Sequence, residues 1–312
     1  MPDLFFYLFG KFVARDDAQP LKGLDASKDQ ELLSFLLIRG QQHHSREALA
    51  AMLWGDTPTD RSKKYLRQSL WHLQSVLESN GRNVAGHLVI EHDWLRLNPA
   101  NRPWCDVDEF EKAVTAAEGI PGRTLTESQA NQLKQAAVLY RDDLLVGWYQ
   151  DWVLFERERL QNRYLLLLDK LIVYSEAHQE YEQGQTYAAH ILRYDPARER
   201  THRELMRLFY LSGDRTAALR QYERCAIALQ RELGVRPEKR TIDLYEQMKS
   251  GRYGQSDATT PNPPAVSDEY AEPRDLLDCL KHIHRMLNSV QRRIQHDISA
   301  IEHLPRTNRK KL

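Results

Sequence analysis

The period of the hydrophobic positions changes several times in the first third of the chain. Residues 4–14 are rich in aromatic and β-branched side chains, which indicates strand pairing in a short sheet. We expect the polar residues and proline of 16–20 to end this run. Leucines at helical spacing then predict a helix that Ser27 caps and that ends at Gly40.

Two further helices and a hairpin follow. Ser45 is a suitable cap for a short helix that ends at Gly55, and a third helix is expected to begin at 58–60 and run to Ser79. Two short strand-like runs within residues 88–97 predict a hairpin.

Strand, three helices and hairpin in this order are the layout of a winged helix, which we predict for residues 1–104. In such a domain the third helix can enter a DNA major groove while the hairpin touches the adjacent backbone.

From residue 106 to 248 the hydrophobic pattern is helical throughout. Gly184 and Gly213 each precede a stretch of small residues, and we interpret both as turn glycines before a helix. Their spacing of about 30 residues is typical of tetratricopeptide-type repeats. We therefore predict a tetratricopeptide-like repeat domain over 105–250. Further breaks are expected at 119–122, Gly147, 195–196 and 234–237.

Residues 251–274 are rich in Pro, Ser, Thr and acidic residues, which predicts a flexible linker. A helix over 275–305 follows, with apolar side chains in alternating steps of four and three that are typical of a coiled coil. We expect residues 275–304 to form a homodimer or bind a helical partner; packing back on the repeat domain is the alternative. The seam residues are Leu276, Leu280, Ile283, Leu287, Val290 and Ile294. The predicted fold class is mainly α.

Charge narrows the search for a nucleic-acid site. The chain has 44 basic and 44 acidic residues, so its net charge offers no overall attraction to DNA. The third helix nevertheless carries a local basic cluster. On a helical wheel Leu66, Leu70, Leu73 and Leu77 form one stripe, which we assign to the core.

The opposite side of this helix is our candidate DNA-reading face. Arginine and lysine suit phosphates and guanine edges, glutamine suits adenine, and an aromatic ring suits the thymine methyl group. The alternative is a solvated helix face on which Trp71 packs against the second domain. The predicted DNA-binding residues are Arg61, Lys63, Lys64, Arg67, Gln68, Trp71 and His72, with Arg96 on the hairpin.

Other function classes lack support. Cys105, Cys225 and Cys279 are far apart, which argues against a zinc site or a disulfide framework. No signal peptide and no run of apolar residues long enough for a membrane span is present, so we expect a reducing cytoplasm and no membrane partner.

No nucleophile elbow, metal-ligand spacing or phosphate-binding glycine loop accompanies the acidic pairs, so we expect no enzymatic activity, no metal and no cofactor. We interpret the aromatic side chains of Trp148, Tyr149 and Trp152 as core anchors.

Several segments resemble a known family. The first half resembles the DNA-binding part of the Streptomyces antibiotic regulatory protein (SARP) type of activators, and the second half resembles their bacterial transcriptional activator domain (BTAD). The matching segments are 49–54, 65–77, 106–110, 139–148, 151–152, 156–160, 213–222 and 232–237.

The resemblance implies an OmpR-like winged helix fused to a tetratricopeptide-like domain. It also implies binding to double-stranded promoter DNA as dimers on repeats, and contact with RNA polymerase to activate transcription. Members of the family often carry arginines at the positions of His72 and of Gln74 or Ser75, which are neutral here. We therefore expect weaker and less salt-dependent DNA binding.

A second function class stays open. In a protein-interaction adaptor, the repeat domain and the coiled coil would bind partners, and the winged helix would serve only as a docking surface.

Overall fold

The computed structural model describes residues 4–16, 19–39, 42–80 and 86–254. Of these residues, those up to Tyr253 cluster into one compact unit. The predicted coiled coil over 275–305 and all but the first residues of the predicted linker lie outside the described residues.

A small sheet opens the chain, in the strand order β3-β2-β1-β7. β1 (Leu4–Tyr7) and β2 (Val13–Asp16) are antiparallel, so the strand pairing predicted for residues 4–14 takes the form of a hairpin that turns at Gly10, whose φ is +95°. β3 (Gln19–Pro20) pairs with β2, and the region expected to end the sheet therefore extends it. Proline is tolerated there because β3 is an edge strand. β7 (Trp104–Cys105) runs parallel to β1.

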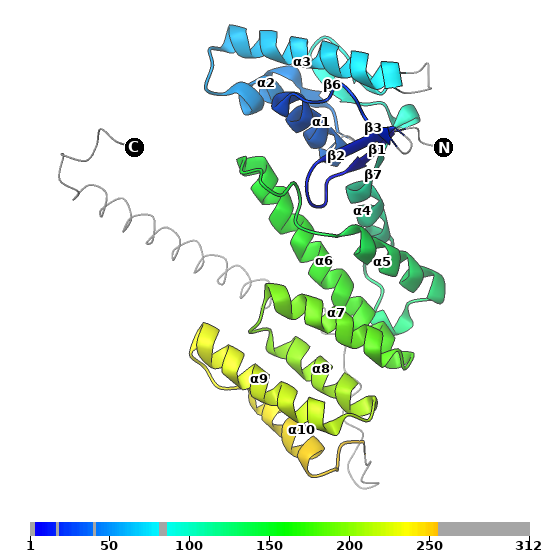
Figure 1. Ribbon diagram of the computed structural model, residues 1–312, viewed down its shortest axis with the longest axis vertical. Helices are drawn as coiled ribbons and strands as arrows, with labels where there is room; N and C mark the ends of the chain where they lie inside the picture. The colour runs from blue at the N-terminus through cyan, green and yellow to red at the C-terminus, as the bar shows by residue number, and fades with distance from the viewer. Residues whose placement is uncertain (1–3, 17–18, 40–41, 81–85, 255–312) are drawn as a thin grey trace, which may run out of the picture. The chain divides into compact units, whose positions relative to one another are not determined.

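The helices and hairpin predicted for this part of the chain are present (Figure 1). Ser45 caps the second helix, because its side-chain oxygen accepts the backbone N–H of Ala48 at 3.4 Å. Ser27 is the first residue of its helix and not the cap, since the preceding carbonyl of Ala26 accepts the first helical hydrogen bonds. The elements are α1 (Ser27–Arg39), β4 (His44–Ser45), α2 (Arg46–Trp54), α3 (Thr59–Asn80), β5 (Leu88–Ile90) and β6 (Trp94–Leu97).

The rest of the described chain is helical, and α6 to α10 pack in succession, each against the next (Figure 1). The fold is thus mainly α with a small N-terminal sheet region. The helices are α4 (Asp106–Ala116), α5 (Glu127–Leu139), α6 (Asp151–Ala177), α7 (Tyr181–Tyr194), α8 (Glu199–Leu211), α9 (Arg215–Leu233) and α10 (Lys239–Lys249), with short 3-10 turns at Pro99–Asn101 and Gly122–Thr124.

The two glycines that looked alike in the sequence have different roles. Gly213 has a φ of +88° and lies in the turn before α9, next to the N-cap residue Asp214, as predicted. Gly184 lies inside α7, so the predicted break there is wrong. A Cβ at Gly184 would lie 3.0 Å from Leu208 Cδ1 and 3.2 Å from Ser175 Cβ, which shows that this glycine lets three helices approach closely. The chain turns instead at Gln179, with a φ of +61°.

One hydrophobic core joins the sheet to the helical part. Phe9, just after β1, packs against Phe110 of α4 and Tyr140 after α5, at centroid distances of 5.3 and 4.6 Å. The buried Asp106 carboxylate at the start of α4 accepts the backbone N–H groups of Leu8 and Phe9 at 2.9 and 3.1 Å. Burial raises the pKa of Asp106 to about 6.

The segment around the start of α6 forms a second set of contacts with the N-terminal elements. Trp148 stacks on Phe12 at 6.3 Å, and Trp152 meets Phe35 of α1 edge-on at 5.3 Å. Both indoles pack on the core as predicted. Tyr149 is 78% exposed, so its interpretation as a core anchor is wrong.

Candidate nucleic-acid interface

Helix α3 is strongly two-sided. Leu66, Leu70, Leu73 and Leu77 are 0 to 2% exposed and pack into the core. The periodicity predicted this stripe because leucines three and four residues apart share one face of a helix. The opposite face is therefore free to meet a ligand.

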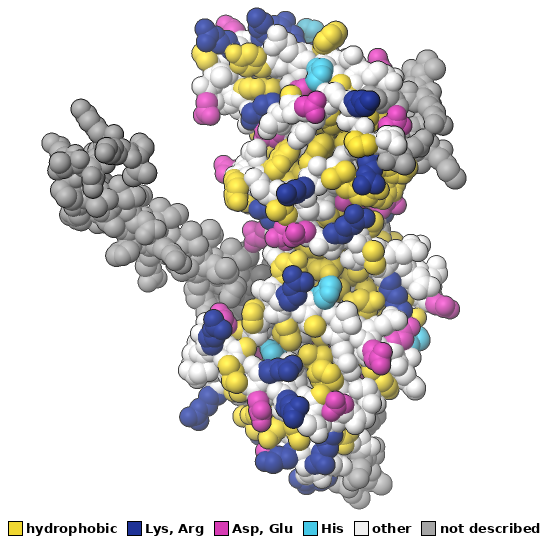
Figure 2. All heavy atoms as spheres, in the orientation of Figure 1, with side chains coloured by type: hydrophobic (Ala, Val, Ile, Leu, Met, Phe, Trp, Pro, Cys, Tyr) yellow, Lys and Arg dark blue, Asp and Glu magenta, His cyan; other side chains and the backbone are white. Residues whose placement is uncertain are grey.

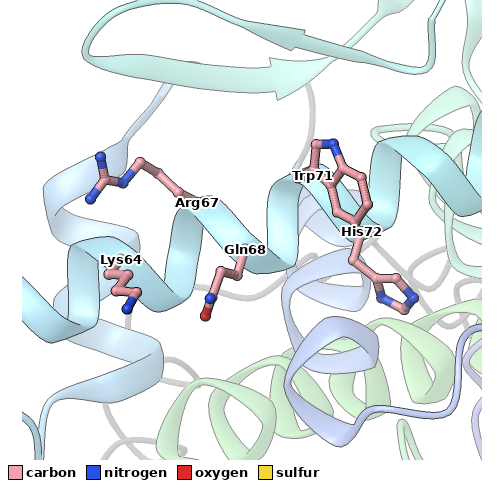
Figure 3. A pocket seen from close by; sticks show the side chains of 5 residues that line it. All are labelled: Lys64, Arg67, Gln68, Trp71 and His72. Carbon is pink, nitrogen blue, oxygen red and sulfur yellow. The ribbon is translucent and has the colours of Figure 1, made fainter.

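That face carries a shallow hollow lined by cationic, amide and aromatic side chains (Figure 3). Arg67 and Trp71 project to one side of the helix, while Lys64, Gln68 and His72 project to the other (Figure 3). Trp71 is 71% exposed. The alternative in which Trp71 packs against the helical part is therefore wrong for the chain as described.

The basic side chains of α3 differ in their partners. Arg61, Lys64 and Arg67 are exposed and have no hydrogen-bond or ion-pair partner among the residues that the structure describes. The Lys63 ammonium lies 2.8 Å from the carboxylate of Glu47 on α2. This hydrogen bond and the charge of Glu47 raise the pKa of Lys63. A DNA phosphate would therefore have to compete with Glu47 for Lys63, whereas Arg61, Lys64 and Arg67 have no such competitor among the described residues.

His72 is tied to α1. Its Nδ1 and the Oδ2 of Asp29 share a hydrogen bond of 2.6 Å, and Asp29 is only 5% exposed. This bond fixes the imidazole ring and leaves Nε2 as the ring nitrogen that can meet a ligand. His72 therefore belongs to the candidate surface at its edge, with one side committed to the fold.

The hairpin β5-β6 carries the remaining predicted residue. Arg96 lies opposite Val89 and is half-buried, and its Nε has no hydrogen-bond partner in the described part of the chain. The tip of the hairpin is held by Arg46, whose guanidinium donates to the carbonyls of Glu91 and His92 at 3.3 and 3.2 Å. This residue was not anticipated from the sequence, because nothing in the local pattern shows that the start of α2 meets the hairpin.

Within the residues that the structure describes, no group of three His, Cys, Asp or Glu side chains is placed to hold a metal ion. The same residues include no helix of the length and apolar character that crossing a membrane requires.

Comparisons with known proteins show what the chain is similar to. A family model described as "bacterial transcriptional activator domain" matches residues 105–249. The transcriptional regulatory protein MoaR1 of Mycobacterium tuberculosis strain H37Rv is 25% identical over 235 residues, which cover 72% of this chain and 73% of MoaR1. MoaR1 of Mycobacterium bovis BCG matches with the same identity and coverage.

Mycobacterium tuberculosis EmbR, solved in complex with a low-affinity phosphopeptide, shares the fold. The TM-score is 0.67 at 21% sequence identity, and the match covers 81% of this chain and 66% of EmbR. The chain thus spans just under two thirds of that solved protein. Residues 105–249 therefore match a bacterial transcriptional activator domain, the chain is similar in sequence to the two MoaR1 transcriptional regulators, and it shares the fold of EmbR.

Proposed function

We propose that this regulator binds promoter DNA through residues 1–104, arranged as a winged helix whose reading helix is α3. The observation that carries the proposal is the exposed face of α3, on which Arg61, Lys64 and Arg67 project without partners among the described residues. A helix that buries leucines on one side and presents unpaired cations on the other suits a major groove.

Each exposed side chain has a chemical task in this proposal. Lys64 and Arg61 neutralise phosphates, and Arg67 can also donate two hydrogen bonds to a guanine edge. Gln68 can pair with adenine, and Trp71 can pack on a thymine methyl group or a sugar. His72 and Arg96 add contacts at the edge of the surface and from the hairpin.

The helical part would then carry the regulatory output. We assign residues 105–250 to a tetratricopeptide-like activator domain that contacts RNA polymerase or other partners, as the family resemblance implies. The heptads of 275–304 supply a homodimer or a helical-partner contact. Sedimentation of the full chain tests this assignment: Ile283→Asp with Leu287→Asp should reduce the association state, and an unchanged state would rule the dimer out.

DNA binding is tested by fluorescence anisotropy of the full chain on duplex DNA at low salt. Lys63 and Lys64 are adjacent and carry the same charge, but only Lys63 is paired with Glu47. We expect Lys64→Ala and Arg67→Ala to weaken binding several-fold each. Lys63→Ala is the matched control and should have the smaller effect. Flat titrations, with folding confirmed by circular dichroism, would overturn the proposal.

The second candidate function is a protein-interaction adaptor. It is favoured by the zero net charge of the chain and by the neutral His72, Gln74 and Ser75 on the helix that would read DNA. The same titrations discriminate between the two functions, since an adaptor would show no salt-dependent affinity for duplex DNA.

A further inference from the structure

Helix α9 carries a second two-sided pattern, far along the chain from α3. Its inner face buries Ala218, Gln221, Cys225 and Leu229. Arg220, Arg224, Ile227 and Arg231 follow one another in steps of four, three and four, so they form one stripe on the opposite face. We call these four residues the α9 outer stripe.

The arginines of this stripe do not hold the fold together. Arg220 and Arg224 are exposed and have no hydrogen-bond or ion-pair partner within the described ranges. Arg231 is 83% exposed, and its one ion-pair partner among the described residues is Glu232, at 3.8 Å. Several other arginines of the helical part do hold the fold together, as Arg198 does on Asp169 at 2.7 Å. The stripe therefore presents guanidinium groups that are available to a partner.

An apolar side chain lies in the middle of these charges. Ile227 is 67% exposed, between Arg224 and Arg231 in the stripe. A single exposed isoleucine is ordinary on a protein surface. Its position among unpaired arginines is more specific, because protein interfaces combine an apolar centre with arginines and are depleted in lysine and acidic side chains.

Positive charge continues beyond the stripe. The chain turns at Gly234, and Arg236, Lys239 and Arg240 are exposed on the following loop and first turn of α10. That turn contains no acidic residue. In Figure 2, Lys and Arg side chains gather over the end of the molecule where Figure 1 places α9 and α10.

We propose that the α9 outer stripe binds an acidic polypeptide, namely a helix with carboxylates on either side of an apolar side chain. The three arginines span about 16 Å along the helix axis, which matches three turns of a partner helix. Carboxylates at equivalent spacing would pair with the guanidinium groups while the apolar side chain covers Ile227.

A nucleic-acid backbone fits this surface less well. Ile227 offers nothing to a row of phosphates, and the exposed Glu223 flanks the stripe and would repel one. A polypeptide can place its carboxylates at separate positions and so avoid Glu223.

Binding to the α9 outer stripe can be followed by NMR through the δ1 methyl group of Ile227. The full chain, labelled at isoleucine methyl groups, is titrated with a synthetic helical peptide that carries three Glu residues around one Leu on a single face. The resonance of Ile227 is assigned with Ile227→Val. We expect it to shift saturably, while the methyl of the buried Ile191 stays unchanged.

Matched peptides and variants decide the outcome. A peptide with Gln in place of Glu should not bind. Arg220→Ala with Arg224→Ala and Arg231→Ala should weaken binding about tenfold, because three exposed ion pairs of modest strength are lost. The same positions changed to Lys should retain most of the affinity.

Three results would overturn the proposal: no shift at Ile227, an equal shift with the Gln peptide, or a shift with duplex DNA and none with the acidic peptide. The triple alanine variant is also measured on duplex DNA under the conditions above. If the triple alanine variant binds duplex DNA as tightly as the wild type, the α9 outer stripe is not part of the DNA-binding surface. The two proposals can then fail independently of each other.

Discussion

The indole Nε1 of Trp152 on α6 donates a hydrogen bond to the carboxylate of Glu31 on α1 at 3.2 Å. Glu31 is 1% exposed, so this bond and the Lys28 ion pair at 2.8 Å together satisfy a buried carboxylate. Helix α1 also carries Asp29, which holds His72 of α3. The activator domain therefore contacts the helix that positions one edge of the candidate DNA surface.

Removing this bond should destabilise the protein. Trp152→Phe keeps the aromatic contact with Phe35 but leaves the Glu31 carboxylate with one partner fewer. We expect the free energy of unfolding to fall by about 1 to 3 kcal/mol, measured by urea denaturation. Trp148→Phe is the control, because Trp148 contributes ring stacking. Equal losses in the two variants would show that ring area, and not the hydrogen bond, is responsible.

Glu47 should restrain DNA binding. Glu47→Gln removes an acidic side chain beside α3 and releases Lys63. We expect tighter binding to duplex DNA and a salt slope steeper by up to about 0.9, the value for one further phosphate contact. Glu109→Gln, which frees Lys112 on α4, is the control and should leave the affinity unchanged. Weaker binding by Glu47→Gln would contradict the assignment of this face.

Asp106 should make stability depend on pH. Burial raises its pKa in the folded protein to about 6 from an ordinary value of 3.8, so the folded state holds the proton more tightly than the unfolded chain. Stability contributed by this group is therefore present at low pH and is lost as the pH rises from about 4 through 6.

The variant Asp106→Asn isolates this effect. Relative to the variant, the wild type should lose up to about 3 kcal/mol of unfolding free energy between pH 4 and pH 7, since one pKa unit corresponds to about 1.4 kcal/mol. Urea denaturation across this range measures the difference. A difference that does not change with pH would contradict the prediction.

Gly122 should not tolerate a side chain. A Cβ at this position would lie 2.6 Å from the backbone carbonyl oxygen of Lys170 on α6, and a backbone atom there cannot move aside. We expect Gly122→Ala to lower the thermal midpoint, with a loss of about 1 to 3 kcal/mol. Gly86→Ala is the control, because its nearest atom, in the Glu78 side chain, is 3.6 Å away. Similar midpoints in the two variants would show that α6 adjusts.

Local periodicity was sufficient to predict most of the elements and the two faces of α3. Leucines three and four residues apart define a buried stripe without knowledge of the rest of the fold. The order of sheet, helices and hairpin followed from changes in that period. The family resemblance added the functional class, a transcriptional regulator, which cannot be predicted from the spacing of hydrophobic residues.

Several of the errors and omissions share one physical cause, because they depend on partners that are distant in sequence. Gly184 looked like a turn residue, but its role is set by Leu208 on the next helix. The partner of His72 lies 43 residues earlier, at Asp29. Lys63 and Lys64 are indistinguishable in the sequence until the fold brings Glu47 to one of them.

The central claim is that the exposed face of α3 neutralises DNA phosphates. Its most direct test is the salt dependence of duplex affinity for the full chain and for the triple variant Arg61→Ala, Lys64→Ala and Arg67→Ala. If each residue contacts one phosphate, the slope of log affinity against log salt should become shallower by about 2.7, at about 0.9 per contact. An unchanged slope in a correctly folded variant would contradict the claim.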